Sequence, residues 1–167
     1  MGRSRRDIGD MGEYYVLYRL VEEGFVATLA PRSTTKAIDI LVSTDDGLPS
    51  TVQVKTKGRR SPCWRLAKRH GDLETPGLYY ALVDLGVEPY ATYVLPAVEM
   101  ARVVRDSYNA WISTPPTRGR SKNPNEKPGA MRMICDPFPS TTFGDVPGCP
   151  PGWMEPHREN WDLLKSR

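Results

Sequence analysis

The chain has 167 residues, with a hydrophobic share of 39%, a charged share of 26% and a net charge of +3. A chain of this length buries one hydrophobic core, so we expect one functional site. No stretch approaches the roughly 20 consecutive apolar residues that span a bilayer, so we expect no membrane partner.

The cysteines and the N-terminal residues predict the cellular location. The basic first residues are not followed by the apolar run of a signal peptide, so secretion is not expected. Cys63, Cys135 and Cys149 are odd in number and form no CxxC pair, which argues against a disulfide framework and against a zinc knuckle. We therefore expect a reduced, cytoplasmic setting. His70 and His157 are expected to be surface or packing residues.

Hydrophobic periodicity predicts alternating helices and strands. Apolar residues at helical spacing, ended by Gly24, predict the first helix, and short β-rich runs between loops predict strands. In chain order we expect a helix over 10–24, strands over 25–30, 37–43 and 51–56, a helix over 64–73, strands over 77–85 and 90–96, and a helix over 97–111. This order predicts an α/β domain with helices around one mixed sheet of about five strands.

The composition changes after Ser113. Ten of the sixteen prolines lie between Pro115 and Pro156, where glycine and basic residues are also frequent. We expect residues 1–112 to form the α/β core and residues 113–152 to form an irregular, basic arm that is partly mobile without a partner. Residues 153–167 regain apolar side chains and are expected to pack back on the core.

Two of the predicted strands carry polar residues that a sheet would bring together. Side chains alternate between the two faces of a strand, so Gln53 and Lys55 share one face, roughly 6.5 Å apart at a rise of about 3.3 Å per residue. Asp39 interrupts an apolar run, and a buried carboxylate is costly unless it is paired or binds a metal. If the two strands form a hairpin, Asp39 joins Gln53 and Lys55 on one face.

These groups match the requirements of phosphodiester hydrolysis. Carboxylate and amide oxygens are suitable ligands for Mg²⁺ or Mn²⁺, and a lysine can orient or deprotonate the attacking water. Positive charge also stabilises the transition state. Glu13 is a fourth candidate, because Gly9 and Gly12 would let its helix approach the sheet closely.

The order of these residues resembles that of the PD-(D/E)xK nuclease superfamily, especially its Holliday-junction-resolvase-like and Mrr-like branches. The matching elements are Gly12-Glu13, Asp39 in the run AIDILV and Gln53-Val54-Lys55, a QxK variant. The resemblance covers roughly the first 95 residues and implies a restriction-endonuclease-like core. It also implies a metal site at Asp39, Gln53 and the Val54 carbonyl, with Lys55 as the catalytic lysine. From its place on the first helix, Glu13 is expected to bind a metal-bound water or a second ion.

Basic residues surround this candidate site in the sequence. A run without acidic residues follows Lys55, and such runs track phosphates when they lie beside a site. The residues expected to contact nucleic acid are Arg32, Lys36, Lys57, Arg59, Arg60, Arg65, Lys68 and Arg69. The arm adds Arg118, Arg120, Lys122, Lys127 and Arg132. We expect a Mg²⁺- or Mn²⁺-dependent endonuclease that acts on double-stranded or branched DNA.

Two other interpretations remain open on sequence grounds. Gln53 stands where most members of the superfamily have an acidic residue, and a neutral amide holds a divalent ion less strongly than a carboxylate. The fold is then a degenerate nuclease that binds DNA or a protein partner without cleavage. Alternatively, Asp39 and Lys55 form only a buried ion pair. The sequence also leaves open whether two copies pair as a homodimer to cut both strands.

Overall fold

The computed structural model describes residues 4–31, 38–43, 49–115 and 131–165, and the central feature is a five-stranded sheet. The strands are β1 (Val26–Leu29), β2 (Ile40–Ser43), β3 (Ser50–Lys57), β5 (Leu78–Asp84) and β6 (Ala91–Pro96), in the spatial order β1-β2-β3-β5-β6. Only the β3–β5 pair is parallel. The predicted mixed sheet of about five strands is therefore confirmed.

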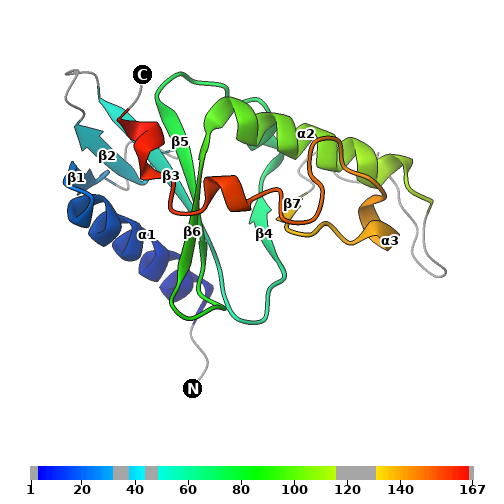
Figure 1. Cartoon of the computed structure of the whole chain (residues 1–167), viewed down its shortest axis with the longest axis horizontal. Helices are drawn as coiled ribbons and strands as arrows, with labels where there is room; N and C mark the ends of the chain where they lie inside the picture. The colour runs from blue at the N-terminus through cyan, green and yellow to red at the C-terminus, as the bar shows by residue number, and fades with distance from the viewer. Residues whose placement is uncertain (1–3, 32–37, 44–48, 116–130, 166–167) are drawn as a thin grey trace.

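Two long helices cover opposite faces of this sheet (Figure 1). Val16 and Leu20 of α1 (Arg5–Glu22) pack in one buried cluster with Val52 and Val54 of β3. On the other face, α2 (Ala97–Ser113) places its apolar side in a second cluster with alternate residues of β5. The predicted layers are thus present. Of the described helices, none has the length and apolar character that crossing a membrane would require.

The first helix begins earlier in the chain than periodicity predicts. The hydroxyl of Ser4 accepts a hydrogen bond from the Asp7 amide at 3.1 Å, and the Asp7 carboxylate accepts one from the Ser4 amide at 2.8 Å. This capping box satisfies amides that would otherwise lack partners, so the helix starts at Arg5 rather than at residue 10. The extra turn also carries Arg5 toward the site described below.

The contact between α1 and β3 depends on Gly12, which is buried. A β-carbon at position 12 would overlap Thr56 Oγ1 and would lie 2.9 Å from Thr56 Cβ. We expect Gly12→Ala to lower the free energy of unfolding by about 1–3 kcal/mol, measured by urea denaturation, because the helix must move away from the strand. Gly9→Ala is the matched control. A β-carbon there meets nothing within 4 Å, so helix propensity should stabilise this variant by up to about 1 kcal/mol. Equal effects of the two substitutions would contradict the close approach.

The prediction of a helix over 64–73 is wrong. Cys63–Leu66 instead form β4, which pairs antiparallel with β7 (Arg132–Cys135) in a separate two-stranded sheet, and a short 3₁₀ helix, η1 (Lys68–Gly71), follows. The physical reason is a contact with a segment distant in the sequence. The Trp64 indole is buried and donates a hydrogen bond to the Val83 carbonyl at 2.8 Å, which holds the segment extended against the main sheet.

A disulfide joins Cys63 and Cys135, which face each other in the β4–β7 register. The expectation that the cysteines form no disulfide framework is wrong for this pair, because spacing along the chain does not reveal which residues a strand pair brings together. Cys149 is a buried free thiol, and burial raises its pKa to about 11. The cytoplasmic setting inferred from the cysteines stays a prediction.

The expected irregular arm is ordered from residue 131 onward. This region contains β7 and α3 (Ser140–Phe143), and its side chains Phe138, Phe143 and Trp153 join the buried cluster beneath α2. Aromatic residues therefore hold this proline-rich segment in place. Arg118, Arg120, Lys122 and Lys127 lie outside the described residues. The three-part division of the chain stays a prediction.

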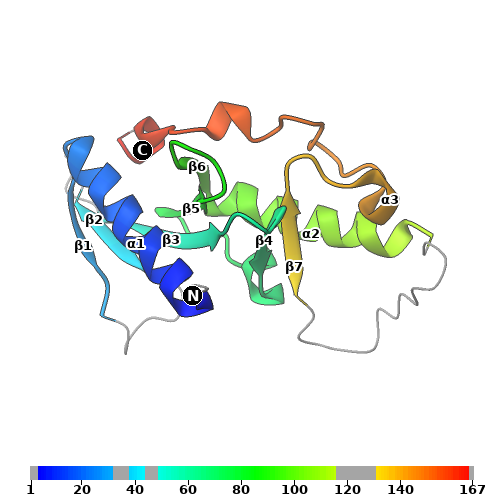
Figure 2. The same ribbon diagram turned by 90° about the horizontal axis from the view of Figure 1, so that it is seen from below.

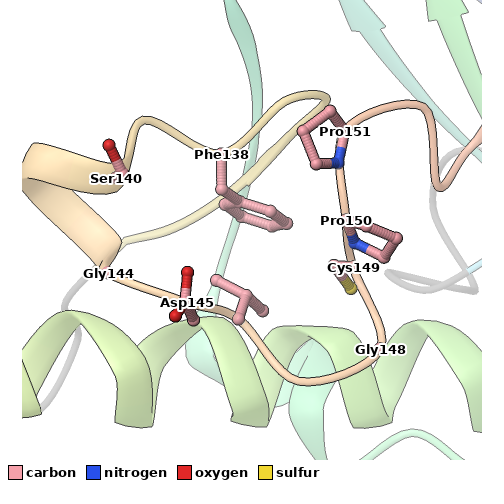
Figure 3. Close-up of a pocket in the computed structure, with 9 residues that line it drawn as sticks. Phe138, Ser140, Gly144, Asp145, Gly148, Cys149, Pro150 and Pro151 are labelled. Carbon is pink, nitrogen blue, oxygen red and sulfur yellow. The ribbon is translucent and has the colours of Figure 1, made fainter.

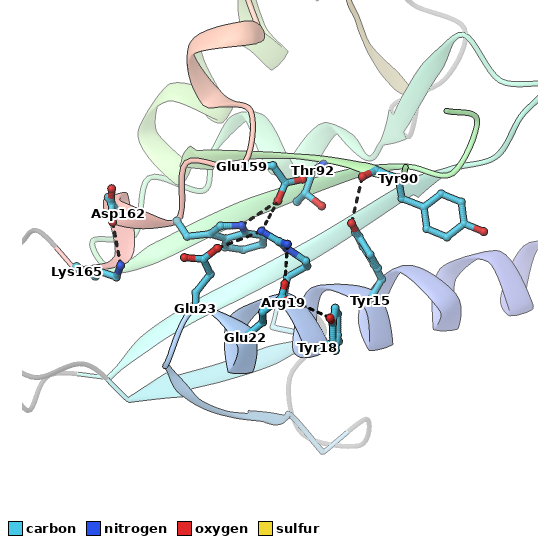
Figure 4. A network of polar contacts seen from close by, with 11 residues as sticks. Tyr15, Tyr18, Arg19, Glu22, Glu23, Tyr90, Thr92, Glu159, Asp162 and Lys165 are labelled. Carbon is cyan, nitrogen blue, oxygen red and sulfur yellow. Dashed lines mark hydrogen bonds and ion pairs between the residues drawn. The ribbon is translucent and has the colours of Figure 1, made fainter. Parts of the chain in front are cut away.

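The C-terminal segment packs against both buried clusters. It contains the 3₁₀ helices η2 (Glu155–His157) and η3 (Trp161–Leu164), and Trp161 is buried against the cluster of α1. Figure 4 shows the network that fixes it. The Glu159 carboxylate accepts hydrogen bonds from the Thr92 amide at 2.8 Å and the Trp161 indole at 3.0 Å, and it lies 3.2 Å from the Arg19 guanidinium.

Candidate functional site

The candidate site forms beside the first residue of β2, where the antiparallel strand β3 continues past it. The Asp39 amide donates to the Val52 carbonyl at 3.0 Å, and the strand itself begins at Ile40, so Asp39 stands at the entry of β2 rather than within it as predicted. β3 continues to Lys57, and beyond Val52 no described strand pairs with the edge of β3 that faces β2. Backbone groups of Val54 are therefore presented at a free strand edge.

Asp39 and Lys55 both bind the backbone of Val54. The Val54 amide donates to Asp39 Oδ2 at 2.7 Å, and Lys55 Nζ donates to the Val54 carbonyl at 3.2 Å. The Asp39 carboxylate thus replaces the missing partner strand, which accounts for an acidic residue beside an apolar run. One carboxylate and one ammonium are consequently held next to each other at the same strand edge.

An open groove of about 1280 Å³ runs over this edge. Glu13 from α1, Asp39, Val54 and Lys55 all line it, and all but Val54 are partly exposed. Gln53 does not line the groove, because its side chain is buried with only 2% of its surface exposed. The structure therefore brings Glu13, Asp39 and Lys55 to one groove and keeps the Gln53 side chain out of it.

Lys55 lies in an electrostatically crowded environment. Burial lowers the pKa of its ammonium group, the positive charge of Arg69 lowers it further, and the negative charges of Asp39 and Glu13 oppose the shift. These four charged groups are close enough to influence one another. The two carboxylates thus favour the charged form of Lys55.

A buried pair lies near the lysine, and sequence reasoning did not find it. His70 Nδ1 and the Tyr80 hydroxyl are 2.7 Å apart, and His70 is 2% exposed. Burial, together with the positive charges of Lys55 and Arg69, lowers the pKa of His70 to about 4. Burial also raises the pKa of Tyr80. The pair is neutral at physiological pH, and the prediction of a packing histidine is confirmed for His70.

Exposed arginines surround the groove. The four that line it are Arg5, Arg59, Arg60 and Arg65. Arg5 was missed by the sequence analysis, although the basic N-terminal residues were visible there. Among the described residues, none of these four side chains forms an ion pair, so their charges are available to an anionic ligand.

The other basic residues predicted to bind nucleic acid have different surroundings. Lys57 lines the groove, but its ammonium lies 3.0 Å from the Asp84 carboxylate and 4.1 Å from the centre of the Trp64 ring. Lys68 and Arg69 are exposed on η1 and do not line the groove. Arg132 is buried over the ring of Tyr108 and is not part of a basic surface. Arg32 and Lys36 lie outside the described residues.

The donor set of the groove suits a hard divalent cation. Within the part of the chain that the structure describes, no group of three or more His, Cys, Asp or Glu residues is positioned to hold a metal. Among the groove residues, Asp39 and Glu13 have carboxylates, and Val54 has a backbone carbonyl that accepts a hydrogen bond from Lys55 Nζ. Mg²⁺ commonly keeps several waters and uses only one or two carboxylates, so this set fits Mg²⁺ or Mn²⁺.

A second, smaller pocket lies in the C-terminal region (Figure 3). It has a volume of about 400 Å³ and is lined mainly by prolines, glycines and apolar side chains around Phe138. Its ionisable lining residues are Asp145 and Cys149, and the raised pKa of the thiol makes Cys149 a poor nucleophile. The groove over β3 is therefore the better candidate.

The fold and groove define an α/β protein whose mixed sheet and flanking helices are compatible with a nuclease-like core. No family model matches the sequence, and no curated protein matches it. The fold is similar to that of a solved bacterial homing endonuclease, I-Ssp6803I, with a TM-score of 0.52 and 17% sequence identity. The similarity covers 98% of this chain and 92% of that chain, so it extends beyond the sheet to the C-terminal region.

Proposed function

We propose that this protein is a metal-dependent endonuclease that hydrolyses phosphodiester bonds in DNA, with a site of the PD-(D/E)xK type. The proposal rests on one observation: Asp39 and Lys55 both form hydrogen bonds with the backbone of Val54 at a free strand edge. Glu13 and four exposed arginines line the same groove. The fold similarity to a homing endonuclease supports the same class of activity.

In this proposal the oxygen donors Asp39, Glu13 and the Val54 carbonyl hold Mg²⁺ or Mn²⁺. When bound, such an ion polarises the phosphoryl oxygens and lowers the pKa of a coordinated water. The Gln53 side chain is buried and does not line the groove, so it is not assigned as a metal ligand. This assignment differs from the ligand set that the family resemblance implies, in which the Gln53 side chain binds the metal directly.

The remaining groups act on the substrate itself. Lys55 is anchored at the Val54 carbonyl, where its ammonium can hold the attacking water or stabilise the charge that develops on the phosphoryl oxygens. The groove arginines neutralise neighbouring phosphates and so fix the position of the strand. Pairing of two copies to cut both strands stays a prediction.

The second candidate function is DNA binding without cleavage. One observation favours it: the amide of Gln53 replaces a carboxylate and is buried rather than presented to the groove. Fewer anionic ligands weaken metal binding. The two functions share the fold and the arginines, so only a cleavage assay separates them.

The proposal is tested by incubating the protein with supercoiled plasmid, linear duplex, single strands, RNA and four-way junctions, in Mg²⁺ or Mn²⁺ and in excess EDTA. We expect cleavage of a duplex or branched DNA with either ion and none in EDTA. Binding without cleavage of any substrate would support the second candidate function. Cleavage that is unaffected by EDTA would contradict the metal-dependent site.

The arginines of the groove should account for a measurable part of the affinity for DNA. We expect Arg59→Glu combined with Arg60→Glu to weaken duplex binding and to reduce the slope of log K against log salt by about 2, because each lost phosphate contact contributes roughly 0.9. Fluorescence anisotropy over a salt series measures both quantities. The matched control is Arg158→Glu with Lys165→Glu, which makes the same charge change in the C-terminal segment, outside the groove. An identical salt slope in the two double variants would remove the groove arginines from the interface.

A further inference from the structure

The two-stranded sheet of β4 and β7 is largely buried, and Arg65 is its exposed residue. The register pairs Trp64 with Ile134 and Leu66 with Arg132, and all four side chains are buried. The alternate positions pair Arg65 with Met133 and Cys63 with Cys135 on the opposite face, where the cysteines are buried and Met133 packs against the core cluster. Arg65 is exposed and Met133 is partly exposed. The ribbon therefore presents one cation, Arg65, at its surface.

The ribbon is a rigid support for Arg65. The Trp64 indole is bonded to the Val83 carbonyl of the main sheet, and the guanidinium of Arg132 lies 3.5 Å from the centre of the Tyr108 ring on α2. The Cys63–Cys135 disulfide links the two strands at one end. Each strand is thus tied to a different layer of the core, and recognition residues on such elements need little ordering upon binding.

Strand β4 forms part of one wall of the candidate groove. Cys63 and Arg65 of β4 line the groove together with Asp39 and Lys55, and so does Met131, next to the start of β7. Figure 2 shows β4 and β7 lying across the end of β3, and β4 contacts that strand. A ligand that fills the groove can therefore contact both Lys55 and Arg65.

Arg65 differs from the other basic residues of the groove in the secondary structure to which it belongs. Its side chain forms no ion pair with any residue that the structure describes. Arg59 and Arg60 lie in the turn between β3 and β4, whereas Arg65 projects from the middle of a paired strand. A flexible turn suits phosphate contacts, while a fixed strand position suits the directional hydrogen bonds of base recognition.

We infer that β4 reads the sequence of duplex DNA through the major groove, with the guanidinium of Arg65 donating to the edge of a guanine. The major groove is about 12 Å wide and admits a two-stranded β-ribbon, and arginine binds guanine O6 and N7 with two hydrogen bonds. The inference rests on the proposed action on DNA. It adds that the substrate is a duplex with a preferred sequence that contains guanine.

The test is selection of bound sites from a library of randomised duplexes, carried out in EDTA so that binding is measured without cleavage. We expect the wild-type protein to enrich a guanine-containing site. Arg65→Ala should lose the preference at one base pair, on the order of ten- to a hundredfold, and Arg65→Lys should not restore it, because lysine lacks the two-pronged geometry. Arg60→Ala is the control and should weaken binding to all sequences alike. Unchanged thermal midpoints establish that the exposed substitutions leave the fold intact.

Two results would overturn the inference. The first is enrichment of the same site by Arg65→Ala and by the wild-type protein, and the second is a wild-type protein that enriches no sequence. Uniform weakening by Arg65→Ala with full rescue by Arg65→Lys would make Arg65 a phosphate contact and would also overturn it. None of these results bears on cleavage, which the substrate panel measures separately, so the proposed function can stand while the ribbon inference fails.

Discussion

Lys55→Met is expected to lower the rate of DNA cleavage by about 10²–10³-fold while leaving DNA binding nearly unchanged. The Lys55 ammonium lies at the Val54 carbonyl beside Asp39, where the proposed reaction takes place. Methionine keeps the unbranched stem that packs along the strand and removes only the charge and the proton donor. Single-turnover cleavage with saturating protein measures the effect on the chemical step.

Lys165→Met is the matched control for this prediction. Lys165 is exposed in the C-terminal segment, pairs with Asp162 at 2.9 Å and does not line the groove. Its replacement should leave cleavage unaltered. Cleavage by Lys55→Met at the wild-type rate, with the same metal requirement, would remove Lys55 from the reaction.

Replacing both Cys63 and Cys135 with serine is expected to lower the free energy of unfolding by about 4 kcal/mol. The two residues are separated by 72 positions in the chain, and a crosslink across so long a segment removes much of the conformational freedom of the unfolded chain. Both side chains are buried, so serine also introduces polar groups into an apolar site. Urea denaturation without reductant measures the change.

The free thiol supplies the control. Cys149→Ala changes a buried cysteine that forms no disulfide, and its smaller cost reports packing alone. Added reductant should lower the urea midpoint of the wild-type protein toward that of the double serine variant and leave the variant itself unchanged. A wild-type midpoint that does not respond to reductant would show that the two sulfurs are not bonded in solution.

The sequence was sufficient to predict the residues that lie on the sheet, because strand periodicity is a local property. Alternation of side chains places Gln53 and Lys55 on one face, and an acidic residue in an apolar run marked Asp39. The hairpin of β2 and β3 then required only a short connection between neighbouring strands. Its register is seen in the pairing of Ile40 with Val52.

Features that depend on distant segments were not predictable in this way. The strand character of Cys63–Leu66 comes from pairing with a strand near residue 132, so local periodicity around Trp64 suggested a helix instead. The disulfide has the same origin. The burial of Gln53 depends on the layers that pack around β3, which its own strand does not specify.

The groove also contains a residue that the motif could not supply. Arg5 reaches it because the capping box of Ser4 and Asp7 extends α1 by one turn toward the site. Capping was visible in the sequence as a serine followed three residues later by an aspartate. The direction in which the extra turn points follows only from the close contact of Gly12 with Thr56.

The most direct test of the account is metal-dependent cleavage of DNA by the wild-type protein and by Asp39→Asn, with binding measured in parallel. Asparagine can still accept the hydrogen bond from the Val54 amide, so the variant removes the charge and keeps the strand edge in place. We expect wild-type protein and the exposed control Asp162→Asn to cleave in Mg²⁺ or Mn²⁺, and Asp39→Asn to bind the same DNA without cutting it. Equal cleavage by Asp39→Asn and the wild-type protein would contradict the proposed active site.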